Sequence, residues 1–255
     1  MKIFLAGMNG TKYLVENLRE PVPYVLESYW YMTDFMLNAY NKGLFKEFLL
    51  DSGAFTLLEH TTSAPKDILD DYVTRYACFI DENEIDNFFE MDIDGIVGYK
   101  EVLRYRKLIE DITKKPVIPA WHKSRGEDEF IKMCKDYDHV SIGGIVARTE
   151  IKPKEYEYLH WFIEKAHKYG AEIHGLGFTP IKILKEFNFD SVDSISWLAG
   201  GYGGYVFQFD GTNIKTERSA EKGGRRINHR IVNAHNFVQW RRYQDYMSEV
   251  SYVHN

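Results

Sequence analysis

The sequence predicts an α/β protein built as a single domain over residues 1–255, with the architecture of a (β/α)8 TIM barrel. Three observations favour this fold class. Short β-rich runs alternate with longer stretches of helical periodicity along the whole chain. Eight such runs fit within 255 residues, close to the roughly 250 of a typical barrel of this class. No linker, repeat or low-complexity tract divides the chain. An open doubly wound sheet is the alternative that the same alternation allows.

Each expected strand is a short run rich in β-branched, aromatic or other apolar residues. The runs are "KIFLAG" (2–7), "FLLDS" (48–52), "DNFFEMD" (86–92), "PVIPAW" (116–121), "HVSIGGI" (139–145), "AEIHGLG" (171–177), "SVDSIS" (191–196) and "GYVFQF" (204–209). In a barrel the C-terminal ends of all strands meet at one mouth, where catalytic groups lie. The residues that end these runs are therefore the first candidates for a functional site.

The expected helices lie between these strands. After Pro65, apolar residues recur with 3.6-residue spacing at Ile68, Leu69, Tyr72, Val73, Tyr76 and Ile80. A second stripe ends at Gly170 and consists of Leu159, Phe162, Ile163 and Ala166. A short helix is expected over residues 181–187, further helices within 9–47, and a long polar loop over 210–226.

The composition is that of an ordinary globular protein, with 44% hydrophobic and 27% charged residues. The start "MKIFLAGMNG" is too short and too polar for a signal peptide, and no apolar run approaches the ~18 residues of a membrane span. We therefore expect a cytoplasmic protein without membrane contact. Only Cys78 and Cys134 are present, so neither a disulfide framework nor a cysteine-rich zinc site is expected.

Charge is segregated along the chain. Residues 222–242 contain no acid and six cations, namely Lys222, Arg225, Arg226, Arg230, Arg241 and Arg242. Removing these six charges from the net charge of −6 leaves −12 on the remainder. This pattern indicates a local phosphate-binding face on an acidic body, formed chiefly by Lys222, Arg225, Arg226 and Arg230. A solvated helix face is the equally good alternative.

Acids and glycines end several of the expected strands. They are Asp51, Asp92, the pair Gly143 and Gly144, the pair Gly175 and Gly177, and Asp193. Each has an ordinary explanation: Asp51 as a turn former, Asp92 or Asp94 as a helix cap, and the glycines as sharp-turn residues. A carboxylate in a buried strand is nevertheless costly unless it is paired or used. Their shared position at strand ends therefore favours a functional site.

Three segments, in order, resemble one enzyme family. They are "DSGAF", "VSIGGIV" and "GLGFTPIKILKEFNFDSVDSISW", and they cover roughly residues 48–200. They are similar to the tRNA-guanine transglycosylases and to the related transglycosylases that place 7-deazaguanines in DNA, in particular to short, zinc-less members of phage type. The family fold is a (β/α)8 barrel, which agrees with the alternation of strands and helices.

The resemblance implies roles for individual residues. Asp193, the second acid of "DSVD", falls on the family's nucleophile, and Asp190 is expected in the turn before the strand. Asp51 falls on the general acid/base. Asp92 matches an acid that binds the Watson–Crick edge of the base, and Gly143 with Gly144 would donate backbone N–H groups to its carbonyl. The neighbouring residues Ser52, Gly53, Gly175 and Gly177 are expected to complete the substrate-binding site.

Two departures from the family pattern matter. The cysteine-rich zinc element of the tRNA-modifying members is missing, which favours DNA over tRNA as the partner. "PAWHK" stands where many members have a Gln-Gly pair. Trp121 could stack on the base and His122 could hydrogen-bond to it, while a core aromatic and a satisfied core histidine are equally good explanations.

The function implied is exchange of guanine in a polynucleotide for a 7-deazaguanine base through a covalent aspartyl–sugar intermediate. Such chemistry breaks an N-glycosidic bond at C1′, with one carboxylate as nucleophile and a second as proton carrier. It needs no metal and no other cofactor. The alternatives are a tRNA-guanine transglycosylase, an N-glycosidase that releases a base or hydrolyses a nucleoside, and a non-catalytic base-binding barrel. The oligomeric state stays open.

Overall fold

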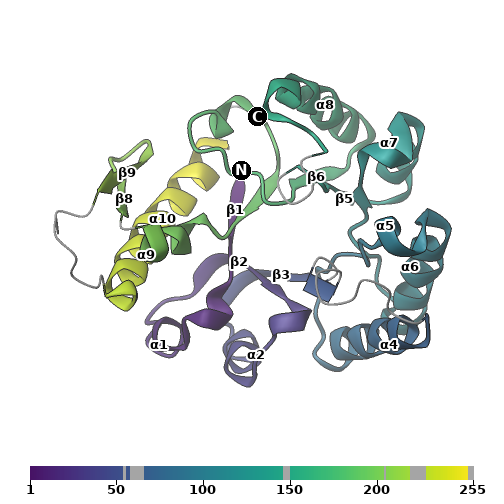
Figure 1. The fold of residues 1–255 in the computed structure, drawn as a ribbon, viewed down its shortest axis with the longest axis horizontal. Coiled ribbons are helices and arrows are strands. Elements are labelled where there is room, and N and C mark those ends of the chain that lie inside the picture. Colours follow the sequence, from purple (N-terminus) through teal and green to yellow (C-terminus); the bar gives the residue numbers. More distant parts are fainter. Residues whose placement is uncertain (54–55, 58–65, 146–149, 204, 219–227, 252–255) are drawn as a thin grey trace.

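A computed structural model of the chain describes residues 1–53, 56–57, 66–145, 150–203, 205–218 and 228–251. Its centre is a curled parallel sheet with helices on its outer face (Figure 1). The seven strands run in the order β3-β2-β1-β7-β6-β5-β4. Their bounds are β1 Lys2–Ala6, β2 Val22–Ser28, β3 Phe45–Asp51, β4 Ala120–Trp121, β5 His139–Ile142, β6 Glu172–Gly175 and β7 Ser191–Ser194.

The expected closed (β/α)8 barrel is wrong, because this sheet is open and only curled. Among the described residues, its edge strands β3 and β4 are linked through residues 86–92 by two isolated bridges, Leu50 to Phe88 and Phe89 to Ile118. A side chain ends this pairing: the Glu90 carboxylate, and not a main-chain carbonyl, accepts the Ala120 N–H at 2.9 Å. The run expected as the third strand therefore forms no ladder.

Two further strand predictions need correction. The run expected at 204–209 does not join the central sheet; it forms β8 (Tyr205–Phe209), which pairs antiparallel with β9 (Ile214–Arg218). The place beside β1 belongs to β2, in a region where only helices were expected. A proline such as Pro23 argues against a central strand over residues 22–28. Val25 and Leu26 nevertheless pair with β1.

The helices are α1 Lys12–Val15, α2 Asp34–Asn41, α4 Lys66–Glu82, α5 Asp94–Val97, α6 Tyr99–Thr113, α7 Gly126–Asp136, α8 Leu159–Tyr169, α9 Ala199–Gly203 and α10 His229–Ser251. Short 3-10 turns are η1 Met8–Gly10, η2 Tyr29–Tyr31, η3 Lys123–Arg125, η4 Pro153–Tyr158, η5 Leu184–Glu186 and η6 Ser196–Leu198. The expected helices after Pro65 and before Gly170 are confirmed as α4 and α8, with Ile68 exposed on α4. Residues 181–187 form only η5.

The core has two parts. The larger part lies between the sheet and the helices, and a smaller cluster fills the concave side of the sheet. This inner cluster consists of Phe4, Ala6, Leu26, Leu49, Phe89 and Ile118. Side chains alternate along a strand, so Asp51 shares the inner face with Leu49, and Asp193 shares it with its register partner Phe4. The sheet thus directs both acids to its concave side.

Within the described part of the chain, no helix combines the length and apolar character that crossing a membrane requires.

Candidate active site

Asp51 ends β3 and is held by the turn that follows it. Its Oδ2 accepts a hydrogen bond from the Gly53 N–H at 2.9 Å. Gly53 has a φ of 75°, and a Cβ at this position would lie 2.6 Å from the Cβ of Trp30. Only glycine fits this turn without strain, because the left-handed conformation and the close side chain both exclude a larger residue. The "DSG" motif therefore fixes where the carboxylate points.

The pKa of Asp51 is raised from 3.8 to about 6. Burial is the main cause, and the nearby charges of Asp193 and Asp92 raise it further against the hydrogen bond from Gly53. Asp51 therefore forms the turn before Gly53 and also lies near two other acids, so the two explanations that the sequence allowed hold together. A carboxyl group with this pKa exchanges a proton readily near neutral pH.

Asp193 lies on β7 and has two donors on one oxygen. Its Oδ1 accepts the Gly177 N–H at 2.6 Å and lies 3.2 Å from Nε2 of His174. His174 is fully buried and its Nδ1 lies 2.8 Å from the Ser191 hydroxyl. The imidazole thus helps to fix the orientation of the Asp193 carboxylate. Asp51 and Asp193, which we call the acid pair, both lie on the concave side of the sheet, and the charge of Asp193 is near enough to raise the pKa of Asp51.

Asp190 belongs to the opposite end of β7. Its Oδ2 accepts the Ile173 N–H at 2.8 Å and lies 3.0 Å from Nε2 of His167. Its carbonyl accepts the Lys2 N–H at the start of β1. These contacts tie the beginnings of three strands together. Asp190 therefore has a structural role in the turn before β7, away from the acid pair.

Glu27 is an acid that the sequence reasoning missed. It is 2% exposed on β2, and its two oxygens accept the N–H groups of Asn9 and Ser28 at 2.8 and 3.1 Å. Burial raises its pKa to about 7, against these hydrogen bonds, and the charge of Asp51 adds to the rise. A signal was present, because "VPYVLES" is an apolar run that ends on an acid, as "FLLD" does.

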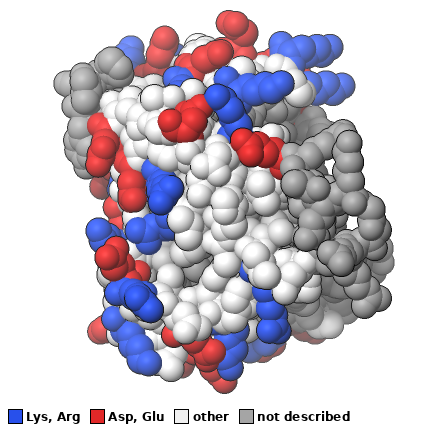
Figure 2. All heavy atoms as spheres, turned by 90° about the vertical axis from the view of Figure 1, so that its left-hand side faces the viewer, with Lys and Arg blue, Asp and Glu red and all other residues white. Residues whose placement is uncertain are grey.

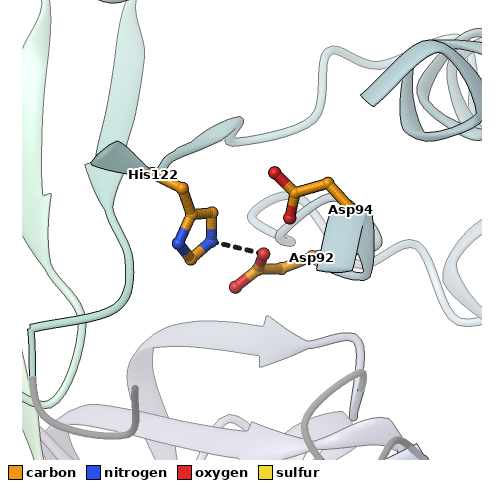
Figure 3. Close-up of side chains that lie close together, drawn as sticks. All are labelled: Asp92, Asp94 and His122. Atoms are coloured by element: carbon orange, nitrogen blue, oxygen red, sulfur yellow. Dashed lines mark ion pairs between the residues drawn. The ribbon is translucent and has the colours of Figure 1, made fainter. Parts of the chain in front are cut away.

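A second group of charged side chains lies near the acid pair and consists of Asp92, His122 and Glu150; we call it the imidazole cluster. His122 follows β4 and is 1% exposed. Its Nε2 forms an ion pair with Asp92 Oδ1 (Figure 3), and its Nδ1 lies 3.2 Å from Glu150 Oε2. The Lys123 N–H also donates to Glu150 at 3.2 Å. Asp92 and His122 were expected site residues, whereas Glu150 was not.

Buried ion pairs support the imidazole cluster from behind. Arg125 donates to Glu90 at 2.7 Å and to Asp94 at 3.1 Å, and Arg106 donates to Glu90 at 2.8 Å. Asp94 is in the first turn of α5, whose N-cap is Ile93 without a side-chain capping bond. Neither Asp92 nor Asp94 therefore serves as the helix cap that the sequence allowed. Removing one member of such a network leaves a buried charge without compensation, which is strongly destabilising.

Asp92, Asp94 and His122 are close enough to be considered as metal ligands. Their potential ligand atoms lie within 4.8 Å of one another (Figure 3). Two positive groups compete for these carboxylates, however, because His122 pairs with Asp92 and Arg125 pairs with Asp94. We assign no metal to this group.

The glycine pair packs against the imidazole cluster. A Cβ at Gly143 would lie 2.6 Å from Cε1 of His122 and 3.4 Å from Oδ2 of Asp92. Gly144 has a φ of 71°, and a Cβ there would lie 2.7 Å from the carboxyl carbon of Glu150. Both glycines are therefore required by close approach. They bring the end of β5 beside Asp92. The expected donation of the Gly143 N–H to a base carbonyl is wrong, however, because this N–H donates to the Trp121 carbonyl at 2.8 Å.

Other expected site residues have mainly supporting positions. Trp121 is 2% exposed, with its ring centroid 4.3 Å from that of Phe162, so its indole lies in the core between β4 and α8. Ser52 is fully buried, and its carbonyl accepts the Tyr72 hydroxyl at 2.6 Å. Gly175 ends β6 beneath Phe178. The Trp121 indole N–H donates to the Gly126 carbonyl at 2.7 Å, so this side chain is engaged away from the acid pair.

The expected phosphate-binding residues are only partly described. Lys222, Arg225 and Arg226 lie outside the described residues. Arg230 is exposed in the first turn of α10, with its guanidinium 5.5 Å from the ring centroid of Tyr13. Figure 2 shows the side that carries β8 and β9, where described Lys and Arg residues are interspersed with Asp and Glu around an uncharged central area. The described residues on this side thus form no continuous basic face.

No protein-family model matches the chain, and no curated protein matches its sequence. The resemblance carried by the three segments therefore stays a prediction, and the geometry of the site has to support any function.

Proposed function

We propose that this chain is a base-exchange transglycosylase that replaces guanine in a polynucleotide, DNA in preference to tRNA, by a 7-deazaguanine base. One observation carries the proposal: the acid pair joins two carboxyl groups with different environments at one end of the sheet. Asp51 is half-buried and its pKa is raised to about 6, whereas Asp193 Oδ1 accepts the Gly177 N–H and lies 3.2 Å from Nε2 of His174. Exchange at C1′ needs this division of labour between a proton carrier and a nucleophile.

The reaction would proceed in two displacements. Oδ2 of Asp193 attacks C1′ while the C1′–N9 bond breaks, and N9 of the departing guanine takes the bond's electron pair and the proton of Asp51. This leaves a sugar–aspartyl ester and an Asp51 carboxylate. The incoming base then loses its N9 proton to Asp51 as N9 attacks C1′ and releases Asp193. Both partners return to their initial protonation states, as in retaining glycosidases.

Base recognition would fall to the imidazole cluster and the glycine pair. Oδ2 of Asp92 lies on the side of Gly143, as the 3.4 Å approach of a Cβ there indicates. A carboxylate oxygen accepts the N1–H and exocyclic N–H donors that guanine and 7-deazaguanines share. Backbone N–H groups near Gly144 would serve the carbonyl of the same edge. This arrangement supports a guanine-like base and disfavours adenine, whose edge offers a different donor pattern.

The test is incubation of the protein with DNA or with tRNA and 7-cyano-7-deazaguanine, followed by mass spectrometry of the nucleosides from each polymer. We expect the 7-deazaguanine nucleoside to appear in DNA and free guanine to be released in equal amount. Guanine release without incorporation would indicate the N-glycosidase instead, and incorporation only in tRNA would reverse the choice of polymer. No release of guanine from either polymer would overturn the proposal.

A further inference from the structure

Both ring nitrogens of His122 face carboxylates. Nε2 pairs with Asp92 Oδ1, and Nδ1 lies 3.2 Å from Glu150 Oε2 (Figure 3 shows the first contact). A neutral imidazole carries one N–H, so its other nitrogen would present a lone pair to a carboxylate. Both contacts are favourable only when both nitrogens carry protons. The geometry therefore calls for an imidazolium at this position.

The charges around His122 favour the same state. The carboxylates of its buried surroundings are Glu90, Asp92, Asp94 and Glu150, and the cations are Arg106 and Arg125. Lys123 is near in sequence but its ammonium pairs with Glu155. Four carboxylates thus face two guanidinium groups, and an imidazolium reduces the excess of buried negative charge. Burial lowers the pKa of His122, but hydrogen bonding to Asp92 and Glu150 outweighs burial and raises the pKa to about 9.

The ring also connects Asp92 to the glycine pair. It packs on Gly143, where a Cβ would lie 2.6 Å from Cε1, and it holds Asp92 through Oδ1. Oδ2 of Asp92 is the oxygen beside Gly143. Since both nitrogens of His122 are directed at carboxylates, the residue acts on a substrate only through them. This differs from the direct hydrogen bond to the base that the sequence allowed.

We propose that His122 is a positioning residue: its imidazolium holds Asp92 and Glu150 in place so that Oδ2 of Asp92 meets the N–H edge of the base. The proposal rests on the proposed function for the identity of that base. Replacing His122 would remove the ion pair that holds Oδ1 of Asp92, and a misplacement of about 1 Å costs up to roughly 10²-fold in a well-oriented site.

The first experiment compares His122→Gln and His122→Ala with the wild type, using equilibrium binding of free guanine and steady-state exchange. We expect the Kd and the KM for the base to rise roughly tenfold or more, with a smaller change in kcat. His139→Gln is the matched control, because His139 begins the neighbouring strand β5 and its pKa is lowered to about 3 by burial. This control should leave the Kd and the KM unchanged. Base binding by folded His122→Gln at the wild-type Kd would overturn the proposal.

A second measurement does not depend on catalysis. Nitrogen-15 NMR of the histidine rings at pH 7.5 should show two protonated nitrogens at His122 and one at His139, and Asp92→Asn should lower the pKa of His122. A neutral His122 in the wild type would overturn the proposal. Loss of the His122 ring protons on addition of Zn²⁺ would also overturn it, because it would make His122 a metal ligand. Base binding that depends on His122 without any exchange would overturn only the proposed function. Exchange with His122-independent binding would overturn only this inference.

Discussion

Each aspartate of the acid pair owes its chemistry to its immediate neighbours. Asp51 has one backbone donor and lies half-buried near two other acids, so its proton is held until about pH 6. Asp193 has a backbone donor and an imidazole on the same oxygen. The same side chain can therefore carry a proton at one strand end and attack carbon at another.

Asp193→Asn should abolish exchange while the fold stays intact, because the amide keeps the volume but is not a nucleophile. Asp190→Asn is the matched control, since it makes the same change at the other end of β7, where the Asp190 side chain contacts Ile173 and His167. Intact-protein mass spectrometry after mixing with DNA should show the sugar adduct in the control and none in Asp193→Asn. An essential Asp190 beside a dispensable Asp193 would contradict the assignment.

Asp51→Asn should reduce turnover by roughly 10²-fold or more, the usual effect of removing a general acid/base. Under the proposed mechanism, guanine departure requires protonated Asp51, so the single-turnover rate of the wild type should fall about tenfold per pH unit above about pH 6. The return step requires the carboxylate and should slow below that pH. Rapid-quench measurements of guanine release from pH 5 to 8 check both. A wild-type profile as flat as that of Asp51→Asn would exclude the role.

Among the elements, the strands that end on acids were the most predictable. The runs "FLLDS" and "SVDSIS" became β3 and β7, and their acids lie where the strand ends suggested. The neighbours of those acids were not predictable, because His174 and Glu27 belong to segments remote in sequence that only the pairing of strands brings near. The failure of residues 86–92 as a strand has a similar origin, since Glu90 binds Ala120 across the sheet.

The last helix sets the position of the described basic residues. Near its start Asn236 donates to the carbonyl of Trp197 after β7, and near its end Gln244 donates to the carbonyl of Ile3 at the start of β1. The N-terminus of α10 is therefore at the same end of the sheet as the acid pair. Arg230 is at that end, and Arg242 follows twelve residues later, about 18 Å along the helix.

Arg230→Ala should therefore weaken polynucleotide binding, and Arg242→Ala on the same helix should not. If Arg230 contacts one phosphate, its removal should flatten the slope of log K against log salt by roughly 0.7 to 0.9. Fluorescence anisotropy of a labelled oligonucleotide over a salt series measures the slope for both variants. Equal slopes in the wild type and Arg230→Ala would assign this residue to a solvated surface. Arg225→Ala/Arg226→Ala extends the comparison to the preceding segment.

For the whole molecule, the buried and half-buried acids of the candidate site have a cost in stability. The folded-state pKa of Asp51 is above its unfolded value, so the folded protein binds the proton more tightly. The stability that this provides is complete below about pH 4 and is lost as the pH rises through about 6. Glu27, with a pKa raised to about 7, acts in the same direction. The acids that define the site thus weaken the fold at the pH where they are useful.

Asp51→Asn should therefore be more stable than the wild type above pH 6. The asparagine does not ionise, so the difference in free energy of unfolding should grow between about pH 4 and 6 to about 3 kcal/mol and then stay constant. Urea unfolding of the wild type and Asp51→Asn at pH 4, 6 and 8 measures this difference. A wild type that stays more stable than Asp51→Asn at pH 8 would contradict the buried, proton-holding environment of Asp51.

The alternation of strands and helices predicted the α/β class and most of the central sheet, but not whether the sheet closes. Closure depends on a few main-chain hydrogen bonds between residues 86–92 and their neighbours. The composition of "DNFFEMD" is typical of a strand. It does not indicate that Glu90 binds Ala120 and Arg106 or that Asp92 binds His122. A hairpin such as β8 and β9 is likewise indistinguishable from a barrel strand until its partner is known.

The position of β1 has a consequence for synthesis on the ribosome. This strand lies between β2 and β7 in the sheet. β7 is the last of the seven strands in the sequence, so all the others are made before it. At about 5–20 residues per second, a nascent chain that has made β1 waits roughly 10 to 40 s before β7 emerges. Throughout that time one edge of β1 is without its native neighbour and is open to pairing with other chains. Holdase chaperones should therefore engage this protein while it is being translated.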